Sequence, residues 1–136
     1  MIFIDTGTFL ARYLERDQHY KEAAPVPVWL RLNRDKPKLY TSAFVLDETL
    51  TLLACRSSYA FAASKGRTIF ASDAFTVLRS SAKDELASLE LFEKYADQKI
   101  SFTDCVSFVL MRKLELREVF TFDQHFRYAG FEVVPA

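Results

Sequence analysis

The sequence predicts an α/β domain built around a mainly parallel β-sheet. Short β-prone runs alternate along the chain with longer segments whose apolar residues recur at helical spacing. Half of the residues are hydrophobic and only 3 of the 136 are glycine, which indicates a packed core rather than a disordered chain. A chain of this length can bury a stable hydrophobic core without disulfide bonds or structural metal ions, and it shows no linker or internal repeat. We therefore expect a single domain over residues 1–136.

The amino-terminal part of the chain is predicted to contain two strands and three helices. Pro25 and Pro27 must break or restart the second helix, because proline lacks the backbone donor that a helix interior needs. Ser42 has the side chain of an N-cap and is expected to begin the third helix. The predicted strands cover residues 2–4 and 38–41, and the predicted helices cover residues 6–15, 18–34 and 43–57.

The rest of the chain continues the alternation of helices and strands. Within the segment 82–95, Leu86, Leu89 and Phe92 are spaced so that they form one helical face, which we expect to point into the core. The predicted helices cover residues 59–72, 82–95 and 102–114, and the predicted strands cover residues 74–79, 119–122 and 131–134.

The charge and hydropathy of the chain limit its partners and location. The 18 basic residues balance the 18 acidic ones, so a nucleic-acid partner must be met by a local patch rather than by a global basic field. No apolar run approaches the length of a membrane span, and the amino terminus lacks the basic-then-apolar layout of a signal peptide. We expect a soluble cytoplasmic protein with no membrane partner.

The cysteines and histidines do not predict a metal or disulfide framework. Cys55 and Cys105 lie in apolar helical contexts and are expected to be small core residues of a reducing compartment. With His19, His125 and no CxxC pair, a structural zinc site is not expected. For His125 we expect a packed or surface position rather than a catalytic role.

Four acidic residues lie at positions that are poorly explained as solvent-exposed surface residues without a specific role. Asp5 ends the apolar run 1–4 and Asp123 ends the run 119–122, so both follow predicted strands. In parallel α/β sheets, sites gather beyond the carboxyl ends of the strands. Asp104 begins a predicted helix, and Glu48 lies on an apolar helical stripe, where a carboxylate is rarely buried unless it is paired or bound to metal.

Each of these acids also has an ordinary explanation. Asp5 and Asp123 could cap the helical turns that follow them, and Asp104 could complete a capping box that Ser101 begins. Asp47 stands beside Glu48 and also has apolar neighbours at helical spacing, so the residues alone do not separate these two. Taken together, however, the four carboxylates predict a cluster of oxygen ligands. Hard oxygen ligands without Cys or His support favour Mg²⁺, with Mn²⁺ as an alternative.

Several segments of the chain resemble the PIN-domain ribonucleases, in particular the VapC-like toxins of bacterial toxin–antitoxin pairs. The resemblance extends over nearly the whole chain. It implies a PIN-like fold with a central five-stranded, mainly parallel sheet flanked by helices on both faces. The segments that carry it are 2–6 (IFIDT), 41–48 (TSAFVLDE), 100–104 (ISFTD), 119–126 (VFTFDQHF) and 129–131 (AGF).

The resemblance implies a metal-dependent endoribonuclease whose acidic quartet is Asp5, Glu48, Asp104 and Asp123. The three aspartates would hold the metal ions directly, and Glu48 would bind a second ion or orient the attacking water. Thr6 and Thr121 are hydroxyl helpers beside the quartet, and Asp47 remains an alternative to Glu48. The resemblance further implies a toxin that acts on RNA, forms a homodimer and is held inactive by a cognate antitoxin.

Basic and aromatic side chains before position 75 are candidates for binding surfaces. For each basic residue, a solvated helix face is the ordinary alternative to an RNA contact. The aromatic residues Phe44, Tyr59, Phe61 and Phe70 are expected mainly in the core, with a dimer or antitoxin groove as the alternative. The candidate RNA-binding residues are Arg12, Arg16, Arg56, Lys65 and Arg67.

Three other functions were weighed against the ribonuclease. A catalytically idle PIN-like domain that binds RNA or protein would be expected to have lost part of the quartet. A phosphate-accepting receiver domain also clusters aspartates around Mg²⁺, but the lysine that it needs after a later strand is missing. A P-loop nucleotide hydrolase is excluded, because three glycines cannot furnish its phosphate-binding loop.

Overall fold

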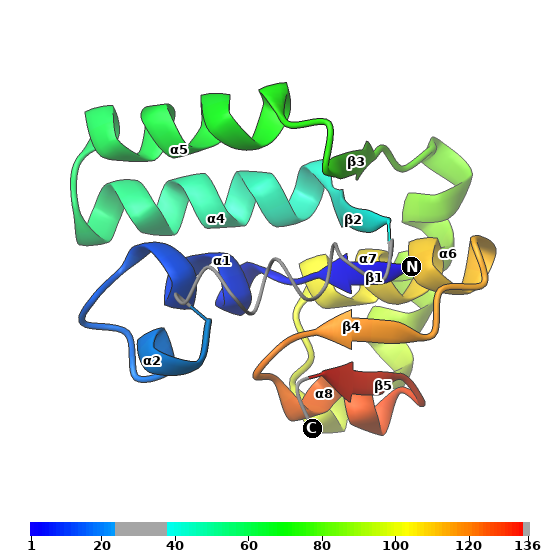
Figure 1. Ribbon diagram of the computed structural model, residues 1–136. Helices are drawn as coiled ribbons and strands as arrows, with labels where there is room; N and C mark the ends of the chain where they lie inside the picture. The colour runs from blue at the N-terminus through cyan, green and yellow to red at the C-terminus, as the bar shows by residue number, and fades with distance from the viewer. Residues whose placement is uncertain (24–37, 135–136) are drawn as a thin grey trace.

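The computed structural model of the protein describes residues 1–23 and 38–134, and in this part of the chain it forms one five-stranded sheet. The strand order is β3-β2-β1-β4-β5, and every pairing is parallel (Figure 1). The predicted parallel α/β architecture is therefore confirmed. The strands are β1 (Ile2–Ile4), β2 (Leu39–Ser42), β3 (Phe75–Leu78), β4 (Glu118–Phe120) and β5 (Glu132–Val134).

Helices cover both faces of the sheet and begin close to the predicted positions. Ser42 caps α4 as expected, since its side chain accepts a hydrogen bond of 3.1 Å from the Val45 backbone N–H. Of the helix predicted over residues 18–34, only α2 falls within the described residues, and Pro25 and Pro27 lie outside them. The helices are α1 (Thr6–Tyr13), α2 (Tyr20–Ala23), α4 (Ala43–Arg56), α5 (Tyr59–Ala71), α6 (Ala82–Lys94), α7 (Phe102–Lys113) and α8 (Gln124–Tyr128), with a 3₁₀ turn at Ala96–Gln98.

The register of the central strand fixes where the site is built. In β1, Ile2 lies opposite Leu39 of β2, and Ile4 lies opposite Phe120 of β4. The backbone N–H of Asp5 donates to the Phe120 carbonyl at 3.2 Å, so the two neighbouring strands end together. Parallel strands end at the same edge of a sheet, and the residues after β1 and β4 therefore meet there.

The core is rich in fully buried phenylalanine. Phe3, Phe108, Phe120 and Phe126 are all 0% exposed, and the rings of Phe108 and Phe126 meet edge to face with centroids 5.0 Å apart. Burying one such ring is worth about 1.5–3 kcal/mol, and edge-to-face pairs add to that. This core lies under the strand ends and holds the loops that follow them in place.

Helix α6 does not face the core with the residues that the sequence predicted. Leu86, Leu89 and Phe92 are 64%, 49% and 45% exposed, so the predicted core face is wrong. The inward positions are instead Asp84 and Ser88, which are buried. These two polar residues make the buried face look like a surface face in the sequence. Their burial is possible because each has a hydrogen-bond partner inside the protein.

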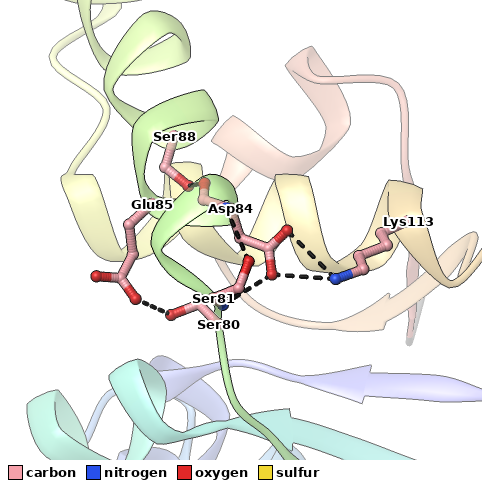
Figure 2. Close-up of polar contacts among 6 residues, drawn as sticks. All are labelled: Ser80, Ser81, Asp84, Glu85, Ser88 and Lys113. Carbon is pink, nitrogen blue, oxygen red and sulfur yellow. Dashed lines mark hydrogen bonds and ion pairs between the residues drawn. The ribbon is translucent and has the colours of Figure 1, made fainter.

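Figure 2 shows how the start of α6 satisfies its buried polar groups. Asp84 and Ser81 form a capping box, in which the Asp84 N–H donates to Ser81 Oγ at 3.1 Å and the Ser81 N–H donates to Asp84 Oδ2 at 2.9 Å. Lys113, at the end of α7, reaches the same carboxylate at 3.2 Å, and the Ser88 hydroxyl donates to the Asp84 carbonyl at 2.7 Å. The hydrogen bond from the Ser81 backbone N–H, with smaller contributions from Lys113 and the Ser81 side chain, holds the pKa of Asp84 below its ordinary value.

Two further expectations about buried residues are corrected. Cys55 is exposed, whereas Cys105 is buried as predicted, and both thiols are free. Tyr59 and Phe70 on α5 are 82% and 53% exposed, so neither belongs to the core. Among the described residues, no helix has the length and apolar character needed to cross a membrane.

Candidate metal centre

The four predicted acids line one cleft of about 560 Å³, although they come from four different parts of the chain. Asp5 follows β1, Glu48 lies on α4, Asp104 is in the first turn of α7 and Asp123 follows β4. The cleft opens at the carboxyl ends of the strands, as the parallel sheet requires. The structure thus brings the whole predicted quartet together.

Asp5 is buried, and its carboxylate is not used for helix capping. It occupies the N-cap position of α1, but its side chain makes no capping hydrogen bond. Instead, Asp5 Oδ2 accepts a hydrogen bond of 2.7 Å from the Thr121 hydroxyl. Thr121 is itself 1% exposed, and its Oγ1 accepts the backbone N–H of Asp123 at 3.0 Å. One hydroxyl therefore positions two acids of the quartet.

Asp104 and Asp123 combine a local structural role with a place in the cleft. Ser101 caps α7 by accepting the Asp104 backbone N–H at 3.1 Å, which leaves the carboxylate of Asp104 free to line the cleft. Asp123 Oδ1 accepts the His125 backbone N–H at 2.9 Å and so caps α8. The capping explanation is thus correct for Asp123, but it occupies only one of the two carboxylate oxygens.

The structure separates Glu48 from Asp47. Glu48 is partly buried and lines the cleft, whereas Asp47 is exposed and lies outside the cleft lining. Consecutive helical residues differ by about 100° in direction, so only one of the two can point into the cleft. Between these two residues, Glu48 is the candidate ligand.

The electrostatics of the cleft favour protons or cations. Burial raises the pKa of Asp5 to about 7, against the lowering effect of its hydrogen bonds and with a further contribution from the charges of Asp123 and Glu48. Burial also raises the pKa of Asp104 to about 9, helped by the charges of the other three acids. At neutral pH, Asp104 therefore keeps its proton, and Asp5 keeps its proton part of the time, unless a cation joins them.

The donor set fits a divalent metal ion. Ligand atoms of Asp104, Asp123 and His125 all lie within 4.8 Å of one another. The Thr6 hydroxyl lines the cleft, is buried and finds no hydrogen-bond partner among the described residues. A buried hydroxyl that has no protein partner and lies beside carboxylate oxygens can form a hydrogen bond to a water that a metal ion holds. Carboxylate oxygens are hard ligands that suit divalent cations.

His125 is closer to the acids than the sequence suggested. Its Nδ1 lies 3.2 Å from Asp123 Oδ1 and 3.7 Å from Asp104 Oδ2, at the wall of the cleft. The side chain of His125 is 33% exposed, which agrees with the packed or surface position that the sequence predicts.

Sequence reasoning missed other residues of the cleft wall. Asp17, Gln18 and His19 reach it from the connection between α1 and α2, Lys99 from the turn before α7, and Phe122 from the residue before Asp123. Lys99 adopts a left-handed backbone conformation with φ of 55°. No periodicity marks these positions, because loop conformation rather than strand or helix spacing places them.

None of the candidate RNA-binding residues lines the acidic cleft, and two of them, Arg16 and Arg56, line a cavity beside it. Arg16 and Arg56 line a second cavity of about 600 Å³ between the ends of α1 and α4, together with Tyr13 and Phe61. The Lys65 ammonium lies 5.1 Å from the centroid of the Tyr13 ring. The Arg12 guanidinium also lies over Tyr13, at 5.8 Å, and Arg67 is exposed on α5. Asp17 lines both cavities, so the two adjoin.

Comparison with known proteins identifies the family. The family model described as PIN domain matches residues 2–132, which is nearly the whole chain. The chain belongs to the PIN-domain family. The resemblance inferred from the sequence segments is confirmed, and the parallel sheet with its acidic edge is the arrangement that this PIN domain uses to build its cleft.

Curated relatives of this PIN domain are described as ribonucleases. The chain is 34% identical, over an alignment of 137 residues covering 99% of both proteins, to the 23S rRNA-specific endonuclease VapC20 of Mycobacterium tuberculosis. It is 28% identical to a VapC ribonuclease of Archaeoglobus fulgidus, with 90% of this chain and 77% of that protein aligned.

Solved structures match the same fold. The crystal structure of M. tuberculosis VapC20, described as a sarcin-ricin loop cleaving toxin, superposes with a TM-score of 0.83 at 31% identity and covers 96% of both chains. VapBC2 from Rickettsia felis gives a TM-score of 0.65 at 17% identity, covering 98% of this chain and 97% of that one. At that identity, the second match shows the fold alone.

Proposed function

We propose that this PIN domain is a metal-dependent endoribonuclease and the toxin of a toxin–antitoxin pair. The observation that carries the proposal is the convergence of four acids, from four separate elements, on one cleft. The descriptions of VapC20 as an rRNA endonuclease and of the Archaeoglobus relative as a ribonuclease support RNA as the substrate. The sarcin-ricin loop of 23S rRNA is the first substrate to test, because the VapC20 structure is described as cleaving it.

The proposed roles divide the quartet by burial and position. Asp5, Asp104 and Asp123 would hold Mg²⁺ or Mn²⁺, which when bound lowers the pKa of a water and neutralises charge on the scissile phosphate. Glu48 would bind a second ion or orient the attacking water. Thr121 holds Asp5 in place through the hydrogen bond described above. The unpartnered Thr6 hydroxyl would orient a water at the same site.

A homodimer is proposed through the exposed apolar face of α6. Leu86, Leu89 and Phe92 lie one helical turn apart and are all well exposed. A contiguous apolar stripe on a helix is costly in water and is typical of an interface. Because both partners would be copies of this chain, Leu89→Glu should shift the protein from dimer to monomer in multi-angle light scattering, whereas Thr76→Glu at an exposed position of strand β3 should not.

The antitoxin is the second proposed protein partner. Helix α5 exposes two aromatic side chains, Tyr59 near its start and Phe70 near its end, that a partner could cover. A partner segment that covers such a surface and extends into the acidic cleft would exclude RNA. Co-expression with the product of the neighbouring reading frame, followed by purification of the pair, tests this part of the proposal.

The enzymatic proposal is tested by cleavage of RNA. Purified wild type, Asp5→Asn and Asp104→Asn are incubated with 23S rRNA and with a sarcin-ricin loop hairpin, in Mg²⁺, in Mn²⁺ and in EDTA. Wild type should cut at defined positions only with metal, and both variants should be inactive. Equal cleavage by wild type and Asp104→Asn would contradict the proposal. Absence of cleavage by metal-loaded wild type would favour the idle RNA-binding domain.

A further inference from the structure

A parallel aromatic stack forms part of the wall of the acidic cleft. The rings of His19 and Phe122 have centroids 4.1 Å apart and an interplanar angle of 2°. Both residues line the cleft that holds the four acids. The two rings come from segments about a hundred residues apart, and neither ring has a part in the proposed metal site.

Phe122 fixes the inner side of this stack. It stands between Thr121, which positions Asp5, and Asp123, so its backbone is tied directly to the metal centre. Its ring meets the buried Phe120 edge to face, with centroids 5.9 Å apart, and packs against the main core. The inner ring is therefore held by packing against the core, on backbone that lies between two residues of the site.

His19 fixes the outer side and is held by its own loop. Its backbone N–H donates to Asp17 Oδ1 at 2.9 Å, and its Nδ1 lies 3.2 Å from Glu22 Oε1. The side chain is still 32% exposed. One face of the imidazole is covered by Phe122, and part of the remaining side-chain surface is open to solvent at the wall of the cleft.

We propose that His19 and Phe122 form a stacking site for an unpaired nucleobase of the RNA, next to the phosphate that is cut. The inference rests on the proposed ribonuclease function and adds to it the class of substrate. Unpaired RNA bases stack on aromatic side chains, and a base on His19 would extend the Phe122–His19 stack by one member. A base inside a helix is not available for such stacking, so the cut falls in a loop or single strand.

The charge of the protein explains why such a site is needed. The chain has no net positive charge, so beyond the metal ions and single basic residues no general field draws the RNA into the cleft. Stacking does not depend on charge, and it is worth roughly 5- to 150-fold in affinity per base. It would add to the hold that the bound metal has on the scissile phosphate.

Two substitutions separate stacking from the other roles that His19 could have. His19→Phe keeps an aromatic face but removes the imidazole nitrogens, whereas His19→Leu keeps an apolar side chain of similar size without the aromatic face. If the ring acts by stacking, Leu should raise KM at least about fivefold, and Phe should recover most of that loss. If the imidazole transfers protons or only braces the loop through Glu22, Phe should be as defective as Leu.

The deciding experiment scans the substrate with single abasic nucleotides. RNA hairpins that differ only in the position of one missing base are cleaved by full-length wild type and by His19→Leu, and kcat and KM are measured. Removal of the base at one position should raise KM of wild type by about the factor by which His19→Leu raises KM on the intact hairpin. Removal of the same base should leave KM of His19→Leu unchanged. The wild-type scan needs no variant protein, so a scan in which no abasic position raises KM overturns the stacking site even if a variant fails to fold.

The outcomes distinguish this inference from the proposed function. If metal-loaded wild type cleaves RNA and Asp104→Asn does not, the ribonuclease stands. The stacking site is then overturned if no abasic position raises KM for wild type, if His19→Leu cleaves like wild type, or if His19→Phe is as poor as His19→Leu. If wild type cleaves nothing, the ribonuclease itself fails.

Discussion

The Thr121 hydroxyl donates a hydrogen bond of 2.7 Å to Asp5 Oδ2, although 116 residues separate the two in sequence. This contact exists because β1 and β4 are adjacent parallel strands that end together. The same oxygen of Thr121 accepts the Asp123 backbone N–H. A single buried hydroxyl thus couples the geometry of two proposed metal ligands to the register of the sheet.

Loss of the Thr121 hydroxyl should therefore weaken metal binding. Thr121→Val keeps the shape of the side chain but leaves the buried Asp5 carboxylate without its donor, and removal of such a supporting group typically costs 10- to 100-fold in metal affinity or activity. Thr121→Ser keeps the hydroxyl and is the matched control. Mn²⁺ affinity measured by calorimetry should fall for Val and stay near wild type for Ser; equal affinities for all three proteins would remove Thr121 from the site.

The pH dependence of stability without metal follows from the raised pKa values. In the folded protein the pKa of Asp5 is about 7 and that of Asp104 about 9, against an ordinary value of 3.8. The folded state therefore binds these protons more tightly than the unfolded state, and the free energy of unfolding should fall as pH rises from about 4 towards 9. Thermal unfolding in EDTA at several pH values measures this fall.

Metal and one substitution provide the controls for that pH profile. Mg²⁺ or Mn²⁺ should raise Tm most at high pH, because the metal replaces the protons that the acids would otherwise bind. Asp104→Asn should give a flatter profile in EDTA and a smaller response to metal. A wild-type Tm in EDTA that rises steadily across this pH range would contradict the assigned pKa directions.

Glu48 and Asp47 form a matched pair on consecutive positions of α4. Glu48→Gln should lower metal-supported cleavage by roughly 10- to 100-fold, because it removes a charge from the cleft wall. Asp47→Asn removes the same charge from an exposed position and should leave kcat within about twofold of wild type. Initial rates on one RNA hairpin compare them. A larger loss for Asp47→Asn would reverse the assignment.

Lys99 is predicted to contact a phosphate of the RNA. It lines the acidic cleft from a left-handed backbone position, which places a positive side chain beside the acids. Lys99→Met keeps most of the stem and removes the charge, so it should weaken binding of all RNA sequences alike and reduce the slope of log Kd against log salt by about 1. Lys83→Met, on the exposed start of α6, is the control and should leave the slope unchanged.

Two glycine substitutions should change stability in opposite directions. Gly130 has φ of +98°, so Gly130→Ala should lower the free energy of unfolding by about 1–2 kcal/mol through backbone strain. Gly7 lies in α1, where an added Cβ meets nothing within 4 Å, so Gly7→Ala should raise stability through helix propensity. Urea unfolding compares the two; equal effects would mean that φ at Gly130 does not limit its substitution.

The acids that follow strands were predictable from the sequence, because parallel strands bring their carboxyl ends to one edge whatever the loops do. The positions of Asp5 and Asp123 at this edge of the sheet follow from that rule alone. Glu48 could not be separated from Asp47, since both have apolar neighbours and only the rotation of α4 about its axis decides which one enters the cleft.

The wrong core face of α6 has its physical cause in buried polar groups that are hydrogen-bonded. Asp84 and Ser88 are polar and therefore resemble surface residues, but the capping box and Lys113 allow them to be buried. The apolar residues of α6 were accordingly assigned to the wrong face. His19 and Lys99 were missed as wall residues because tertiary contacts place their loops, and no spacing rule in the sequence records those contacts.

The central claim is that one carboxylate cluster both binds divalent metal and cuts RNA. Mn²⁺ is titrated into wild type and Asp104→Asn at about pH 8, with bound ion measured by electron paramagnetic resonance and RNA cleavage measured in the same samples. Cleavage by wild type should rise in step with bound Mn²⁺, and Asp104→Asn should lose both together. Cleavage by Asp104→Asn at the wild-type rate, or wild-type cleavage that is independent of bound Mn²⁺, would contradict the claim.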